Sequence, residues 1–171
     1  FANLESGEGS VAKGVQHTDW ANFPHLGVLS LASYVGKFGY ESVYFDGVAV
    51  PIDELFVYVR EKADKILAVC LSAITANFDS CLYVGEFAKS VDEEIKTIFG
   101  NDHFSVMHKE IMKRYWSVDY GVVGNEVYQT LKCLLDDIRD HGHVSRRLPS
   151  LVTKDIKNPA NGGDEEINHH I

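Results

Sequence analysis

Hydrophobic and polar positions alternate along the chain between short runs typical of strands and longer periods typical of helices. The clearest strand is residues 66–71, a continuous apolar run of the kind that is buried on both faces of a sheet. The clearest helix repeats apolar residues every three or four positions over residues 126–140. The whole pattern predicts strands at residues 1–4, 42–45, 66–71, 95–99 and 120–123, and helices that begin near Pro24 and Pro51 and at residues 77–91, 105–115 and 126–140.

This alternation of strand and helix favours parallel strands joined by right-handed crossovers. We therefore predict an α/β protein with a flavodoxin-like (Rossmann-like) fold, in which a five-stranded parallel sheet has the order 2-1-3-4-5 and helices on both faces. The composition changes after Gly142, so we expect one domain over residues 1–142, then a linker and flexible tail over residues 143–171. Residues 148–152 form one short extended segment in this interpretation, and the polar residues 5–22 form a loop.

Composition and charge exclude several classes of protein. Apolar residues make up 45% of the chain and charged residues 24%, which is typical of a globular domain and too apolar for a disordered one. The 16 basic and 25 acidic residues give a formal charge of -9, which argues against a nucleic-acid partner because phosphates attract basic faces. No apolar run is long enough to span a bilayer and no signal peptide is recognisable, so we expect no membrane partner and a cytoplasmic location.

The three cysteines indicate packing rather than metal chemistry. Cys70, Cys81 and Cys133 lie far apart, and neither CxxC nor CxxxCxxC spacing occurs. A zinc ribbon or an iron–sulfur cluster is therefore not encoded in this chain. We interpret the cysteines as small core residues of a protein in a reducing compartment, and we predict no metal ligand.

Candidate binding residues follow the third predicted strand. Ligands of such sheets bind beyond the carboxyl ends of the strands, near the switch point between the first and third strands. The loop there contains Ser72, Thr75 and Asn77 ahead of a helix N-terminus. Their hydroxyl and amide groups suit a phosphate or an amide-bearing ligand, and capping of the helix is the alternative role.

The loops after the fourth and fifth strands add further candidates. Gly100, Asn101, Asp102 and His103 follow the fourth strand, where a glycine permits close approach of the backbone to a ligand. His103 is open to three interpretations: metal ligand, hydrogen-bonding group or ordinary loop residue. In the following loop, Gly124 and Glu126 precede the last helix, and Glu126 either caps that helix or accepts a hydrogen bond from a ligand.

Signatures of several nucleotide and acyl-transfer sites are missing. The sequence contains no GxGxxG loop at a strand–helix junction, no Walker lysine pattern and no GxSxG elbow. A response-regulator receiver requires a phosphoacceptor aspartate after the third strand, and here that strand ends at Leu71-Ser72. Flavin binding stays open but without support, since Ser6, Ser10 and Trp20 in the first loop do no more than allow it.

Several segments together resemble one known family. They are Phe23-Pro24-His25-Leu26-Gly27 and the helix to Val35 (family FPPLGLLYLASYL), residues 72–78 (SAMTPNF), residues 100–103 (GGPH), residues 123–126 (GEGE) and residues 148–155 (lPGLvyRd). This series resembles the cobalamin-binding domain that precedes the catalytic domain of cobalamin-dependent radical S-adenosylmethionine enzymes. The resemblance spans about residues 20 to 155.

The resemblance implies a cobalamin-binding module of a radical S-adenosylmethionine enzyme, a methyltransferase, that holds the methyl-carrying cobalamin. The corrin would lie across the strand ends and its nucleotide tail would enter near the third strand. Ser72, Thr75, Asn77 and the segment from Gly100 to His103 would contact it, with Gly124 and Glu126 nearby. The family lacks the cobalt-ligating histidine of DxHxxG, as does this chain, so we expect cobalt without a protein imidazole below it.

This chain also departs from the family. S-adenosylmethionine and a 4Fe-4S cluster would bind a radical catalytic domain that carries CxxxCxxC, a motif not found here, so that domain would act in cis or in trans. The chain is then either a fragment of a longer enzyme or a stand-alone relative. Asn101 and Asp102 replace Gly-Pro of the family motif. The alternative function is a non-catalytic flavodoxin-like interaction or regulatory domain whose loops only cap helices.

Overall fold

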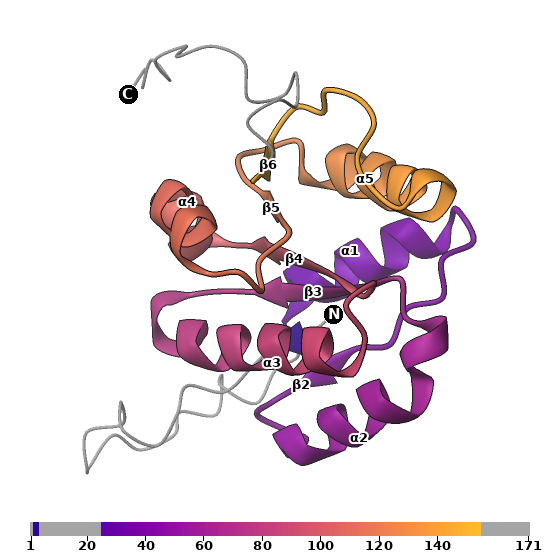
Figure 1. Ribbon diagram of the computed structural model, residues 1–171, viewed down its shortest axis with the longest axis vertical. Coiled ribbons are helices and arrows are strands. Elements are labelled where there is room, and N and C mark those ends of the chain that lie inside the picture. The colour runs from indigo at the N-terminus through magenta and orange to yellow at the C-terminus, as the bar shows by residue number, and fades with distance from the viewer. Residues whose placement is uncertain (1, 4–24, 155–171) are drawn as a thin grey trace.

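A computed structural model describes residues 2–3 and 25–154. Their strands form one six-stranded sheet in the order β2-β1-β3-β4-β5-β6 (Figure 1). Strands β1 to β5 run parallel to one another, and β6 runs antiparallel to β5. The strands are β1 (Ala2–Asn3), β2 (Phe45–Asp46), β3 (Ala68–Ser72), β4 (Lys96–Gly100), β5 (Tyr120–Val122) and β6 (Leu151–Thr153).

The predicted order of the first five strands is confirmed, but the prediction of a purely parallel, five-stranded sheet is wrong. The added strand β6 comes from the segment that the sequence suggested as a linker. It is held in the sheet by pairing along β5 and by the bond from the Val123 N–H to the Ser150 carbonyl, 2.8 Å long. Leu148 and Leu151 are buried beside it, so this segment is part of the domain core.

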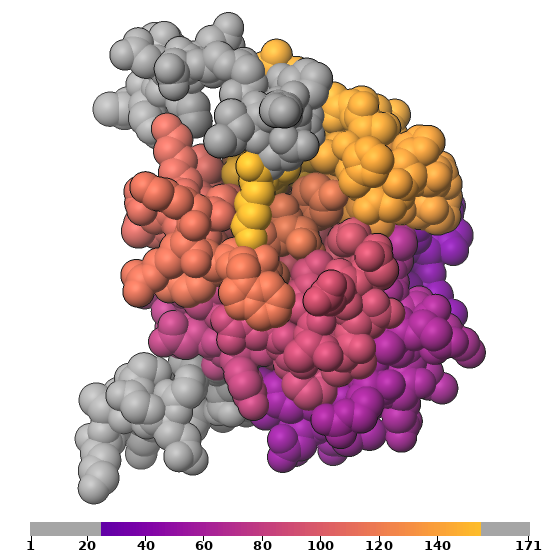
Figure 2. Space-filling view, in the orientation of Figure 1, coloured from indigo at the N-terminus to yellow at the C-terminus, as the bar shows by residue number. Residues whose placement is uncertain are grey.

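Five α-helices cover the two faces of the sheet, as predicted. Helices α1 and α5 pack together on one face, and α2, α3 and α4 cover the other (Figure 1). Figure 2 shows the side chains of α2 and α3 closing over this second face. The helices are α1 (Leu26–Gly36), α2 (Ile52–Lys62), α3 (Phe78–Val91), α4 (Asp102–Arg114) and α5 (Val127–His141), with short 3-10 turns at Ala63–Lys65 and Thr75–Asn77.

The N-terminal ends of α1 and α4 lie at the carboxyl edge of the sheet and place residues there. Helix α1 begins at Leu26, and the His25 side chain caps it by accepting the Val28 N–H. Helix α4 begins at Asp102, three residues earlier than predicted, because the Asn101 side-chain oxygen accepts the Asp102 N–H at 2.7 Å. Asp102 and His103 therefore lie in the first turn of a helix and not in a loop.

Two predicted segments lie outside the described residues: the loop of residues 5–22 and the tail from residue 158. Phe1 and Leu4 of the first predicted strand also lie outside them. Within residues 2–3 and 25–154, no helix has both the length and the apolar character needed to cross a bilayer.

Candidate functional site

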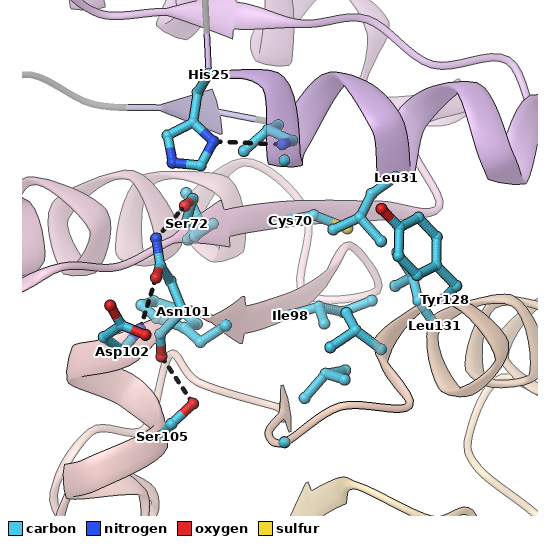
Figure 3. A pocket seen from close by; sticks show the side chains of 18 residues that line it. His25, Leu31, Cys70, Ser72, Ile98, Asn101, Asp102, Ser105, Tyr128 and Leu131 are labelled. Atoms are coloured by element: carbon cyan, nitrogen blue, oxygen red, sulfur yellow. Dashed lines mark hydrogen bonds between the residues drawn. The ribbon is translucent and has the colours of Figure 1, made fainter.

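A cavity of about 330 Å³ lies at the carboxyl edge of the sheet (Figure 3). It is bounded by the ends of β3, β4 and β5 and by helices α1 and α5. This position is beyond the carboxyl ends of parallel strands, where such sheets bind ligands. The volume falls at the small end of the range for ligand pockets, so it suits part of a large ligand or the whole of a small one.

The interior of this cavity is apolar. Side chains from the strands and from α1 and α5 line it: Leu31, Cys70, Ile98, Val122, Val127 and Leu131. Burial raises the pKa of the Cys70 thiol to about 11, so the thiol stays protonated at neutral pH. A protonated thiol is a poor metal ligand and nucleophile, and Cys70 acts here as apolar lining, as the sequence suggested.

The structure brings five of the nine predicted site residues to the cavity. Ser72, Gly100, Asn101, Asp102 and Gly124 line it, from the ends of three neighbouring strands and the first turn of α4. The other four predicted residues are not part of this lining: Thr75, Asn77, His103 and Glu126. The cavity thus collects residues from all three loops that the sequence analysis singled out.

Asn77 holds the loop after β3 together. It is 2% exposed, its side-chain oxygen accepts the Ile74 N–H at 2.8 Å, and its side-chain nitrogen donates to the Ser72 carbonyl at 3.1 Å. These bonds close the 3-10 turn Thr75–Asn77, whereas Asn77 forms no side-chain cap of α3, the capping role that the sequence left open. Asn77 thus shapes the backbone that presents Ser72 at the cavity mouth.

Thr75, His103 and Glu126 lie around this edge in other contacts. The Thr75 hydroxyl and His103 Nδ1 are 3.1 Å apart, and the His103 ring packs on Phe78 with centroids 4.5 Å apart. This pair ties the loop after β3 to the start of α4. Glu126 is exposed at the start of α5, where its backbone carbonyl accepts the Thr130 N–H, and no side-chain cap is formed there.

Asn101 connects two strand ends in a strained conformation. Its side-chain nitrogen donates to the Ser72 hydroxyl at 2.9 Å, and its backbone has φ 78° and ψ -179°. That region is essentially restricted to glycine, and other residues occupy it at a cost of about 1–3 kcal/mol. The hydrogen bonds of the Asn101 side chain therefore offset a backbone strain located at the cavity mouth.

This strain gives a prediction about two substitutions. Asn101→Ala removes the side-chain bonds and keeps the strain, so it should lower the free energy of unfolding by about 2–3 kcal/mol. Asn101→Gly removes the same bonds and also the strain, so its loss should be below about 1 kcal/mol. Urea unfolding of both variants measures the difference, and equal stabilities would contradict the strain at this residue.

Sequence reasoning missed three polar residues of the cavity: His25, Ser105 and Tyr128. His25 caps α1, and Tyr128 lies in the first turn of α5, where its hydroxyl is 2.8 Å from the Ser30 hydroxyl. That bond joins α1 to α5 beside the cavity. The sequence did carry one signal for His25, which stands where the family motif FPPLGLLYLASYL has its second proline.

Apolar side chains are exposed around the mouth. Leu26, the first residue of α1, is 78% exposed, and Ile74, in the loop after β3, is 42% exposed. Both belong to the carboxyl edge of the sheet, like the cavity. Exposed apolar side chains beside a cavity favour a ligand with a broad apolar face.

A second cavity of about 430 Å³ lies away from this edge, between residues 39–43 and β3. It borders the part of β3 from Ala68 to Cys70, because β1 pairs with β3 only at Leu71 among the described residues. Its position near the amino ends of the strands makes it the weaker candidate for a site.

Metal binding by protein side chains alone has no support at either cavity. In the part of the chain that the structure describes, no three His, Cys, Asp or Glu residues gather as a metal site. His103 has Thr75 and Phe78 as its neighbours, which are not metal ligands of this kind.

Comparison with known proteins identifies one matching family. A family model described as the B12 binding domain matches residues 17–129, which is more than half of the chain. The matched range includes α1, β3, β4, β5 and the first turn of α5, which together bound the cavity. No curated protein matches the chain.

Proposed function

The chain belongs to the B12 binding domain family, which supports cobalamin binding, and we propose that it holds the cofactor with the corrin across the carboxyl edge and the nucleotide tail in the cavity. A corrin is far too wide for a cavity of about 330 Å³, so only the tail fits inside. The apolar interior suits the flat aromatic base of the tail. The observation that carries the proposal is this cavity, which lies at the strand ends of a chain that matches the B12 binding domain family.

The residues of the edge have distinct roles in this arrangement. Leu26 and Ile74 would offer apolar contact to the corrin, and Gly100 and Gly124 let the backbone come close to the tail in the cavity. Ser72 supplies a hydroxyl at the cavity mouth, positioned by Asn101. When bound, cobalamin supplies cobalt chemistry for the transfer of a methyl group, while these residues orient it and exclude water from its tail.

Titration with hydroxocobalamin tests the binding. We expect a Kd of about 1 µM or lower, which corresponds to about -8 kcal/mol, measured by calorimetry together with the corrin absorbance. A protein that takes up no hydroxocobalamin at about 100 µM contradicts the proposal and favours the alternative, a non-catalytic interaction domain.

The wider role rests on the sequence resemblance. We propose that this module serves a radical S-adenosylmethionine enzyme of the methyltransferase kind, whose catalytic domain acts in cis or in trans. The similarity of residues 148–155 to the segment that leads into such a domain supports this.

The coding sequence that surrounds this chain tests the wider role. A CxxxCxxC motif in the same reading frame or in an adjacent gene supports it, because that motif holds the 4Fe-4S cluster of the catalytic domain. If neither contains the motif, the methyltransferase role is wrong, even when the chain binds cobalamin.

A further inference from the structure

His25 places an imidazole at the mouth of the cavity. It is half-buried and caps α1, where its Nδ1 accepts the Val28 N–H at 3.4 Å. Figure 3 shows the other ring nitrogen, Nε2, on the side of the ring that faces Ser72 and Asn101.

The surroundings of His25 hold the ring in place. A Cβ on Gly27 would lie 3.3 Å from the ring carbon Cε1, so glycine leaves the room that the ring occupies. The His25 backbone N–H donates to the Tyr44 hydroxyl at 3.0 Å, and that hydroxyl donates to Asp46 at 3.0 Å. These contacts fix both the backbone and the ring, which is the condition for a positioned hydrogen-bonding group.

The bond at Nδ1 determines what Nε2 can do. In neutral imidazole one nitrogen accepts and the other carries the proton, so an Nδ1 that accepts from Val28 assigns the proton to Nε2. A protonated Nε2 has no lone pair for a metal and instead donates a hydrogen bond. His25 is therefore suited to a ligand oxygen and not to cobalt.

We propose that His25 Nε2, together with the Ser72 hydroxyl, donates to a phosphodiester oxygen of the nucleotide tail of the corrinoid. This inference rests on the proposed function, because the tail must enter the cavity for its phosphodiester to lie at the mouth. The N-terminus of α1 adds partial positive charge on the same side, which favours an anionic oxygen. The carboxylate at the mouth, Asp102, is exposed and lies beyond Ser72 and Asn101 from His25 in the view of Figure 3.

Binding of two corrinoids distinguishes a His25 contact with the nucleotide tail from a His25 contact with the corrin ring. Hydroxocobalamin carries the nucleotide tail, and diaquocobinamide has the same corrin without the tail or its phosphodiester. His25→Asn retains a good helix cap and withdraws the donor from the mouth. We expect it to bind hydroxocobalamin about 10-fold more weakly and diaquocobinamide as the wild type does.

A matched control is His108→Ala, since His108 is a half-buried histidine that is not part of the cavity lining. It should bind both corrinoids like the wild type. His25→Ala should show the same selective loss as His25→Asn, with thermal unfolding recorded to separate loss of the cap from loss of binding.

The outcomes distinguish this inference from the proposed function. Equal weakening of both corrinoids by His25→Asn, or no weakening of either, overturns the tail contact. Nitrogen-15 labelling of histidine that changes the axial splitting in the electron paramagnetic resonance spectrum of cob(II)alamin bound to the wild type, but not to His25→Asn, also overturns it, because His25 would then ligate cobalt. A wild type that binds neither corrinoid defeats the proposed function itself.

Discussion

Leu31→Trp is expected to weaken the binding of hydroxocobalamin at least 100-fold. Leu31 projects from α1 into the cavity (Figure 3), which has a volume of about 330 Å³. An indole there would occupy the space that the nucleotide tail needs, and a 100-fold loss corresponds to about 2.7 kcal/mol of binding free energy. Because the added volume enters an open cavity, the fold should tolerate the substitution at a cost of about 1–3 kcal/mol or less.

Two variants control this experiment. Ser33→Trp adds the same side chain at an exposed position of the same helix and should bind like the wild type. Leu31→Ala enlarges the cavity and should also retain binding. Calorimetric titration of the three variants measures the effect, with circular dichroism to verify folding. If the folded Leu31→Trp protein binds as tightly as the wild type, the tail does not occupy this cavity.

The order of the sheet could be predicted because local patterns carry it. A buried run such as residues 66–71 and an amphipathic period such as that of α5 are visible in short windows, and alternating elements leave few topologies. The end of α5 could also be predicted, because a glycine commonly ends a helix in the left-handed conformation. Gly142 adopts φ 77° and its N–H donates to the Ile138 carbonyl at 2.8 Å.

The sequence predicted an extended segment at residues 148–152, but its place in the sheet as β6 could not be predicted, because it depends on pairing with a distant segment. Its residues, Leu151–Thr153, form too short a run for a periodic signal, and the strand exists through its ladder with β5. The start of α4 was missed for a similar reason. Asn101 follows a glycine and resembles a turn residue, while its positive φ and its bond to Ser72 depend on the neighbouring strand.

The candidate site likewise has residues that the sequence could predict and residues that it could not. That three loops converge follows from the geometry of parallel strands, so Ser72, Gly100 and Gly124 were found from their positions after strands. Which side chains face the cavity depends on packing, and Asn77 directs its amide to the backbone instead. His25 belongs to the cavity because the N-terminal end of α1 lies at the strand ends, which local sequence does not reveal.

The second large effect is expected far from the cavity, where an ion pair between buried Lys89 and half-buried Asp119 joins α3 to the residue before β5. Lys89 is 7% exposed, and its ammonium lies 2.6 Å from the Asp119 carboxylate. Asp119 also accepts the Thr97 N–H at 2.8 Å. Asp119→Ala leaves the buried Lys89 ammonium with the Glu93 carbonyl but without a counter-charge, and the Thr97 N–H without its acceptor, so the free energy of unfolding should fall by about 3 kcal/mol.

Comparison with other variants shows whether this cost comes from the unpaired charge. Lys89→Met/Asp119→Ala removes both charges and leaves the Thr97 N–H without its acceptor, as Asp119→Ala does. It should recover part of the stability lost in Asp119→Ala, because the buried ammonium without a counter-charge is then gone. Glu94→Gln removes the partner of Lys96 from an exposed pair, in which Glu94 is 84% exposed, and should change stability by less than about 1 kcal/mol. Guanidinium unfolding of these variants measures all three effects. A double variant no more stable than Asp119→Ala would mean that the lost hydrogen bond to Thr97, and not the isolated charge, accounts for the cost.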